Sequence, residues 1–206
     1  MKKLLTLICL SMAMAAAWAD SPLTSTRFWM IYLTDSTTLP QYEQFNEFGW
    51  GPEVQASLCN PDISVEHRLC LVNLIGWDID GQTHYPELME YYMKQHNCSS
   101  QKEALKQMDG LTLTVFAYVK AMDDYFHVKD AKRLSAEAMK RAPESRAAAM
   151  INALIIAEIA LDHNWNDIYP ACKKVIDNPN LNNDFSDAAI EVIMEYINLY
   201  RGGEGE

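Results

Sequence analysis

Apolar residues recur along most of the chain at the three- and four-residue steps that place side chains on one face of a helix. Strand-like patterns are scarce, and the 111–115 stretch, which is rich in Thr and Val, continues into a helical pattern. The helices predicted in the N-terminal half are 28–33, 40–48, 52–58, 61–77 and one that opens at Pro86. This periodicity predicts an all-α fold.

Capping residues predict where two of these helices begin. Asn60 followed by Pro61 is typical of a helix start, because proline tolerates the first turn and asparagine can accept a backbone N–H. The run from Ser100 to Glu103 matches a capping box, so another helix should begin there and end near Asp109-Gly110.

The C-terminal half has the clearer pattern. Its predicted helices are 111–122, 131–138, 146–161, 168–176 and 185–200. The 146–161 helix is apolar on nearly every side, so we expect other helices to surround it. Short turns make sequential helices antiparallel, which predicts helical hairpins in a solenoid or an irregular bundle.

Small residues and prolines in this half resemble a tetratricopeptide repeat. Ala131 and Ala138 lie seven apart and precede Pro143, and Ala157 precedes Pro179 in a similar segment. The two prolines are 36 residues apart, near the family's period of about 34. The resemblance covers 111–200, although its first helix, around 115–122, lacks the family's Trp and Leu-Gly pair. It implies a right-handed, TPR-like solenoid that binds protein on a concave face.

The N-terminus has the three parts of an export signal. Two lysines precede an apolar run that ends at Trp18, and residues 17–19 (AWA) match a cleavage site. The run of about 15 residues is shorter than the roughly 20 that cross a bilayer. We therefore expect an exported protein, periplasmic or secreted, without membrane insertion after cleavage.

These patterns divide the chain into four parts. They are the signal peptide 1–19, an N-terminal short-helix region 20–109, a TPR-like helical region 110–200 packed on it, and a flexible tail 201–206.

The chain is acidic, with a formal net charge of −11. Negative charge disfavours nucleic acid and anionic lipid, whose phosphates attract lysine and arginine. It suits a basic protein partner, although solubility alone also explains it.

Four cysteines remain after the signal: Cys59, Cys70, Cys98 and Cys172. An oxidising compartment favours disulfides. Three pairings are possible, and we favour Cys59–Cys70 across a short loop together with Cys98–Cys172. The spacing contains no C-x2-C pair, which argues against structural zinc. Free buried thiols are the alternative.

One segment partly matches a calcium-binding loop. Asp78, Asp80, Gly81 and Glu87 fit its spacing, but Gly76 stands where the first carboxylate is required. An Asp-Gly turn between two helices explains the same residues without an ion, and we favour that interpretation.

Asp123 and His127 lie at i and i+4 near a predicted helix end. Such a pair can hold a metal or tune a general base. We interpret it as a solvated helix end, because a metal needs a third ligand.

The sequence contains no motif for a nucleophilic hydrolase, a zinc protease, a phosphate loop or a dinucleotide site. We therefore assign no catalytic residue and no cofactor. The leading hypothesis is a helical protein–protein interaction module. The alternatives are a periplasmic immunity-type inhibitor of a toxin or hydrolase, and an enzyme with an unrecognised helical active site. The aromatic residues between Phe28 and Trp50 are interpreted as core rather than as a binding patch.

Overall fold

A computed structural model describes residues 20–33, 45 and 49–202. These residues form helices and turns, with no β-strand among them. The predicted all-α fold is therefore confirmed. The predicted signal at 1–19, the 40–48 helix apart from Phe45, and most of the tail lie outside the described residues.

The helices follow one another with short connections. The N-terminal half contains η1 (Phe28–Tyr32), α3 (Pro52–Cys59), α4 (Val65–Ile75), α5 (His84–Gln95) and α6 (Gln101–Gln107). The C-terminal half contains α7 (Gly110–Asp123), α8 (Lys129–Arg141), α9 (Arg146–Leu161), η2 (Trp165–Asp167), α10 (Ile168–Ile176), α11 (Asp187–Ile197) and η3 (Asn198–Tyr200).

One predicted helix start is wrong. The Ser64 side chain caps α4 by accepting a hydrogen bond from the His67 N–H at 3.2 Å. Asn60 accepts from the Asp62 N–H at 3.0 Å instead, which keeps the intervening residues in a turn. Ser100 caps α6 as predicted by accepting the Glu103 N–H at 3.3 Å, but the Glu103 carboxylate accepts the Ser99 N–H at 2.8 Å rather than that of Ser100.

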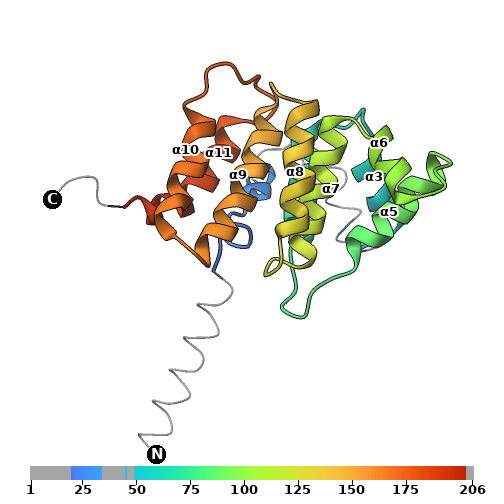
Figure 1. Ribbon diagram of the computed structural model, residues 1–206, viewed down its shortest axis with the longest axis horizontal. Coiled ribbons are helices and arrows are strands. Elements are labelled where there is room, and N and C mark those ends of the chain that lie inside the picture. The colour runs from blue at the N-terminus through green and yellow to red at the C-terminus, as the bar shows by residue number, and fades with distance from the viewer. Residues whose placement is uncertain (1–19, 34–44, 46–48, 203–206) are drawn as a thin grey trace, which may run out of the picture.

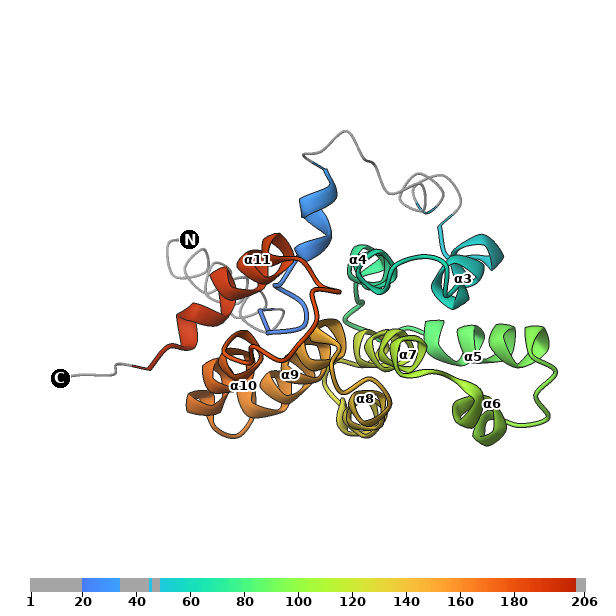
Figure 2. The same ribbon diagram turned by 90° about the horizontal axis from the view of Figure 1, so that it is seen from above.

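The helices lie in three layers (Figure 2). A central row is formed by α5, α7 and α9, with α6, α8 and α10 on one side of it. The opposite side carries α3, α4, η1 and α11. Consecutive helices from α7 to α10 run alternately up and down in Figure 1 and pack as antiparallel neighbours.

The central helices α7 and α9 contribute the largest shares of the buried core. The expectation that the 146–161 helix would be surrounded is confirmed, since α9 packs against α7, α8 and α10. Its side chains Ile151, Leu154 and Ile155 are buried. Phe28 is also fully buried and stacks near Tyr118, which places this aromatic residue in the core as predicted.

The contact between α7 and α8 depends on the absence of a side chain at Gly110. A Cβ built there would lie 2.6 Å from the Ala142 Cβ and 2.9 Å from the Ala138 carbonyl oxygen. Ala138 is itself fully buried. The first turn of α7 can therefore approach the end of α8 only because small residues meet there.

We predict that Gly110→Ala destabilises the fold, although alanine is the better helix former by about 1 kcal/mol. The new methyl group meets backbone atoms that cannot turn aside, and overpacking of this kind costs about 1–3 kcal/mol. Urea unfolding measures the change. Gly51→Ala is the control, because its Cβ would meet only a side-chain oxygen of Glu53 at 3.5 Å. A more stable Gly110→Ala protein would contradict the prediction.

Candidate functional site

The loop between α7 and α8 buries one aromatic ring in the protein and exposes the next one to solvent. Tyr125 is 2% exposed and its ring packs edge-on against Trp77 at 4.8 Å between centroids. The following residue, Phe126, is 47% exposed. The His127 N–H donates to the Asp124 carbonyl oxygen at 3.1 Å, which closes the turn. The loop therefore holds Phe126 in solvent on a fixed backbone.

The loop between α4 and α5 docks against the end of α7. The Asp80 N–H donates to the Asp78 side chain at 2.9 Å, and Gly81 follows with φ +80°. Glycine adopts this left-handed conformation without strain. The Gln82 N–H then donates to the Asp123 carbonyl oxygen at 2.9 Å. The favoured Asp-Gly turn is thus present, and it presents Ile79 at 54% exposure.

The geometry does not assemble the calcium ligand set. The Glu87 carboxylate accepts hydrogen bonds from Thr83 Oγ1 at 2.7 Å and Trp50 Nε1 at 2.8 Å, so it is held away from Asp78 and Asp80. No group of three or more His, Cys, Asp or Glu residues that could hold a metal occurs within the described ranges.

Asp123 is buried, which corrects the expectation of a solvated helix end. It is 7% exposed, and its Oδ2 accepts the Tyr85 N–H at 2.6 Å. Its Oδ1 and the Oε1 of Gln82 are both shut off from solvent without a close hydrogen-bond partner, although the His84 N–H, like that of Tyr85, stabilises the Asp123 carboxylate. Burial raises the pKa of Asp123 to about 6. Both unpaired oxygens belong to residues that line a cavity of about 460 Å³ under the α4–α5 loop.

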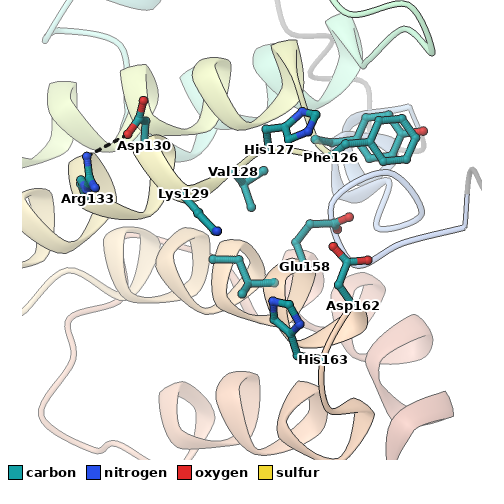
Figure 3. A pocket seen from close by; sticks show the side chains of 11 residues that line it. Phe126, His127, Val128, Lys129, Asp130, Arg133, Glu158, Asp162 and His163 are labelled. Atoms are coloured by element: carbon teal, nitrogen blue, oxygen red, sulfur yellow. Dashed lines mark hydrogen bonds and ion pairs between the residues drawn. The ribbon is translucent and has the colours of Figure 1, made fainter.

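A second cavity of about 570 Å³ opens between the α7–α8 loop and the end of α9. Figure 3 shows Glu158 on α9 and Asp162, the C-cap residue of that helix, with their carboxylates toward the same part of this cavity. Lys129 reaches in from the opposite wall and His163 lies at the base of the view. The cavity therefore has a carboxylate side and an ammonium side.

Glu158 ties the N-terminal segment to α9. Its Oε2 accepts the Leu23 N–H at 3.1 Å, and its side chain is only 7% exposed. Burial, together with the nearby Asp162, raises the pKa of Glu158 to about 7. Leu23 and Ser21 are themselves buried, so residues that begin directly after the predicted cleavage site belong to the core.

The two cavities adjoin each other. Both are lined by Tyr125, Phe126 and His127. Three loops, 76–83, 124–128 and 162–167, lie at one edge of the molecule, which is the lower edge in Figure 1. We refer to these three loops as the loop edge. It offers exposed apolar side chains, two buried carboxyl groups and adjoining cavities, which suit binding.

The predicted disulfides do not form. All four cysteines are free thiols. Cys98 lies between α5 and α6, whereas Cys172 is buried in α10 at the opposite end of the helix array (Figure 2), so these two cannot meet. Cys59 ends α3, and Cys70 is fully buried in the middle of α4. Burial raises the pKa of the Cys59 and Cys172 thiols to about 12.

Glu158 was not predicted as a functional residue, although the sequence around it indicates a buried carboxyl group. Glu158 is the one charged residue in 147–161, an otherwise uncharged and mostly apolar stretch. A carboxyl group in a helix that other helices surround must find a partner or change its pKa. Nothing in the sequence indicates that Phe126 and Trp165 are exposed, because both residue types are common in protein cores.

Comparison of the chain with protein-family models, with curated proteins and with solved structures gives no match. Within the described ranges, no helix combines the length and apolar character required to span a membrane.

We predict that stability falls as the pH rises from about 5 to 8. The folded-state pKa of Glu158 (about 7) and that of Asp123 (about 6) exceed the ordinary carboxyl value of about 4. The stability that these groups contribute is therefore complete below their unfolded pKa, and it is lost as the pH rises through the folded one.

Glu158→Gln tests this dependence, because glutamine stays neutral and still accepts the Leu23 N–H. From pH 5 to 8, its free energy of unfolding should fall by about 1–3 kcal/mol less than that of the wild type. Urea unfolding at both pH values measures the difference. The exposed Glu195→Gln on α11 serves as the control. Equal pH dependence in wild type and Glu158→Gln would contradict the assignment.

Proposed function

We propose that the chain is an exported protein-binding module and that the loop edge is its contact surface. The observation that carries this proposal is that each of the three loops exposes one large apolar side chain. Ile79 is 54% exposed, Phe126 47% and Trp165 64%. Aromatic and aliphatic anchors of this kind supply most of the free energy at protein interfaces.

Acidic side chains surround these three anchors. The loop edge carries five exposed aspartates, which are Asp78, Asp80, Asp124, Asp162 and Asp167. A partner with a basic rim and apolar depressions would complement this pattern in charge and hydrophobicity. The same pattern supports the more specific hypothesis of an inhibitor of a basic toxin or hydrolase.

Hydrogen bonds and packing fix the anchors before a partner arrives. Trp165 Nε1 donates to the Leu161 carbonyl oxygen at 2.7 Å, and its ring meets Tyr200 edge-on at 5.9 Å. Phe126 follows the buried Tyr125. A preordered surface loses less conformational entropy on binding, which favours affinity.

The tetratricopeptide-like arrangement of 111–200 is part of the proposal. The antiparallel packing of α7 with α8 and of α9 with α10 supports it. So does the burial of Ala131, Ala138 and Ala157 at the helix contacts. In this arrangement the 124–128 and 162–167 loops are the turns within the two hairpins, and the 76–83 loop that completes the loop edge precedes them.

We predict that replacing the three anchors abolishes partner binding. The partner is isolated from envelope extract on the immobilised protein, and its Kd for purified variants is then measured by calorimetry. The combined Ile79→Ser, Phe126→Ser, Trp165→Ser variant should bind at least about a hundredfold more weakly, because each anchor contributes about 1 kcal/mol or more.

The matched control replaces exposed apolar side chains away from the loop edge. Met30 and Leu33 are 45% and 49% exposed and belong to η1 and its C-cap, in the layer with α4 and α11. The Met30→Ser, Leu33→Ser variant should bind within about twofold of the wild type. Equal losses in both variants, or none in the anchor variant, would refute the proposed surface.

The proposed export signal also predicts where the mature protein begins. Cleavage between Ala19 and Asp20 leaves Ser21 and Leu23 in place, and these are 2% and 0% exposed. Sequencing of the exported protein should therefore begin at Asp20. An Ala19→Arg variant should accumulate as the heavier precursor, since small residues precede such cleavage sites. A mature chain that begins after Leu23 would contradict both the site and the docking of this segment.

A further inference from the structure

The two outer layers of helices carry opposite charge. On one side of the central row, α6, α8 and α10 contain nine Lys or Arg residues and three Asp or Glu residues. On the other side (Figure 2), α3, α4 and α11 contain five Asp or Glu residues and one Arg, which is buried. A chain with a net charge of −11 therefore has one basic face. Opposite charges on opposite faces favour the stacking of one copy on the next.

A groove runs through the basic face. It is a cavity of about 490 Å³ between α8 and α10, both of which pack against α9 at its floor. Met139 from α8, Ile156 from α9 and Val175 from α10 give the cavity an apolar lining. Met139 and Ile156 are only half-buried, so the lining can gain contacts with an apolar side chain from outside. We refer to this cavity as the outer groove.

Two exposed lysines lie at the outer groove. Lys174 on α10 lines it, and Lys132 lies on α8 two helical turns before Met139. Neither lysine forms an ion pair with a residue that the structure describes, whereas Lys173 beside them is paired with Asp177. Asp167, which also lines the groove, precedes Lys174 by seven residues, or about 10 Å along the helix axis. One end of the groove therefore attracts acidic groups, and the end at Asp167 repels them.

The outer side of α11 carries the complementary pattern. Glu191, Glu195 and Leu199 follow one another at four-residue steps, which places them along one side of α11 and the turn that ends it. All three are exposed, Leu199 by 73%. Neither glutamate forms an ion pair within the described ranges, whereas Asp187 at the start of the helix is paired with Arg146. We refer to Glu191, Glu195 and Leu199 as the α11 stripe. It is acidic at one end and apolar at the other.

We infer that the outer groove of one copy receives the α11 stripe of a second copy. In this contact Lys132 and Lys174 pair with Glu191 and Glu195, and Leu199 enters the apolar part of the groove. The uncharged end of the stripe then lies toward the acidic end of the groove, which fixes the direction of docking. The occupant is a second copy because each chain carries both complementary surfaces, so every copy in solution brings a stripe for each groove.

The contact is head-to-tail. The groove and the stripe are different surfaces on opposite sides of the molecule (Figure 2), so each bound copy still offers one free groove or one free stripe. An arrangement of this kind extends or forms a ring, whereas a symmetric dimer would use the same surface twice. Neither surface contains an anchor side chain of the loop edge. The inference therefore goes beyond the proposed function and does not rest on it.

Sedimentation velocity of the mature chain tests the contact. Association should increase with protein concentration and proceed beyond the dimer. It should weaken when the salt concentration is raised from about 0.1 M to 1 M, because screening shortens the reach of surface charges from about 10 Å to 3 Å. A protein that stays monomeric up to about 1 mM, or that stops at a dimer, would overturn the inference.

Two variants that each lose one surface give a sharper test. The groove variant carries Ile156→Asp and Lys174→Ser, and the stripe variant carries Glu195→Ser and Leu199→Asp. Each variant alone should self-associate at least about tenfold more weakly than the wild type. An equimolar mixture should form a one-to-one complex that grows no further, because only one intact groove and one intact stripe remain per pair. A mixture that stays monomeric while the wild type associates would reject these surfaces.

The matched control removes one exposed charge from each outer layer at the other end of the helix array (Figure 2). Glu53→Ser on α3 combined with Lys102→Ser on α6 should leave self-association within about twofold of the wild type. An equal loss in this control would show a general charge effect and reject the assigned surfaces. If the groove variant does not fold, as judged by circular dichroism, the exposed Lys174→Glu replaces it, and its mixture with the stripe variant decides the question.

Discussion

The rest of the structure depends on the burial of α9. A sixteen-residue helix that is apolar on nearly every side is stable in water only when neighbouring helices cover it. Here α7, α8 and α10 provide that cover. The turns that join these helices must then lie at the two ends of the array, which is why loops distant in sequence share one edge.

Two carboxyl groups interrupt this apolar interior close to that edge. Glu158 anchors the Leu23 N–H, and Asp123 anchors the Tyr85 N–H. Each carboxyl group accepts a backbone N–H from a segment that is remote in sequence. This hydrogen bond offsets part of the free-energy cost of desolvating the carboxyl group. The second Asp123 oxygen, Oδ1, is shut off from solvent beneath the α4–α5 loop.

The loop edge combines rigid support with exposed side chains. Tyr125 is buried and the Leu161 carbonyl oxygen accepts the Trp165 indole N–H, while the side chains of Phe126 and Trp165 are exposed. Under the proposed function, these exposed apolar side chains serve as contacts whose backbone is already ordered before binding. The acidic residues between them favour solubility, and under the proposed function they would complement a basic partner.

The sequence by itself determined the helical class, most helix positions, the surrounded state of α9 and the Asp-Gly turn. These features depend on local periodicity, capping and backbone preference, which short segments carry. Only the tertiary structure decided that Asp123 is buried, that Glu158 holds the N-terminal segment and that the cysteines stay apart. Burial and distance between remote residues depend on how helices pack, and the spacing of cysteines or carboxylates along the chain does not encode that geometry. The same reason explains why the loop edge, which three separate turns form, could not be predicted from any one of them.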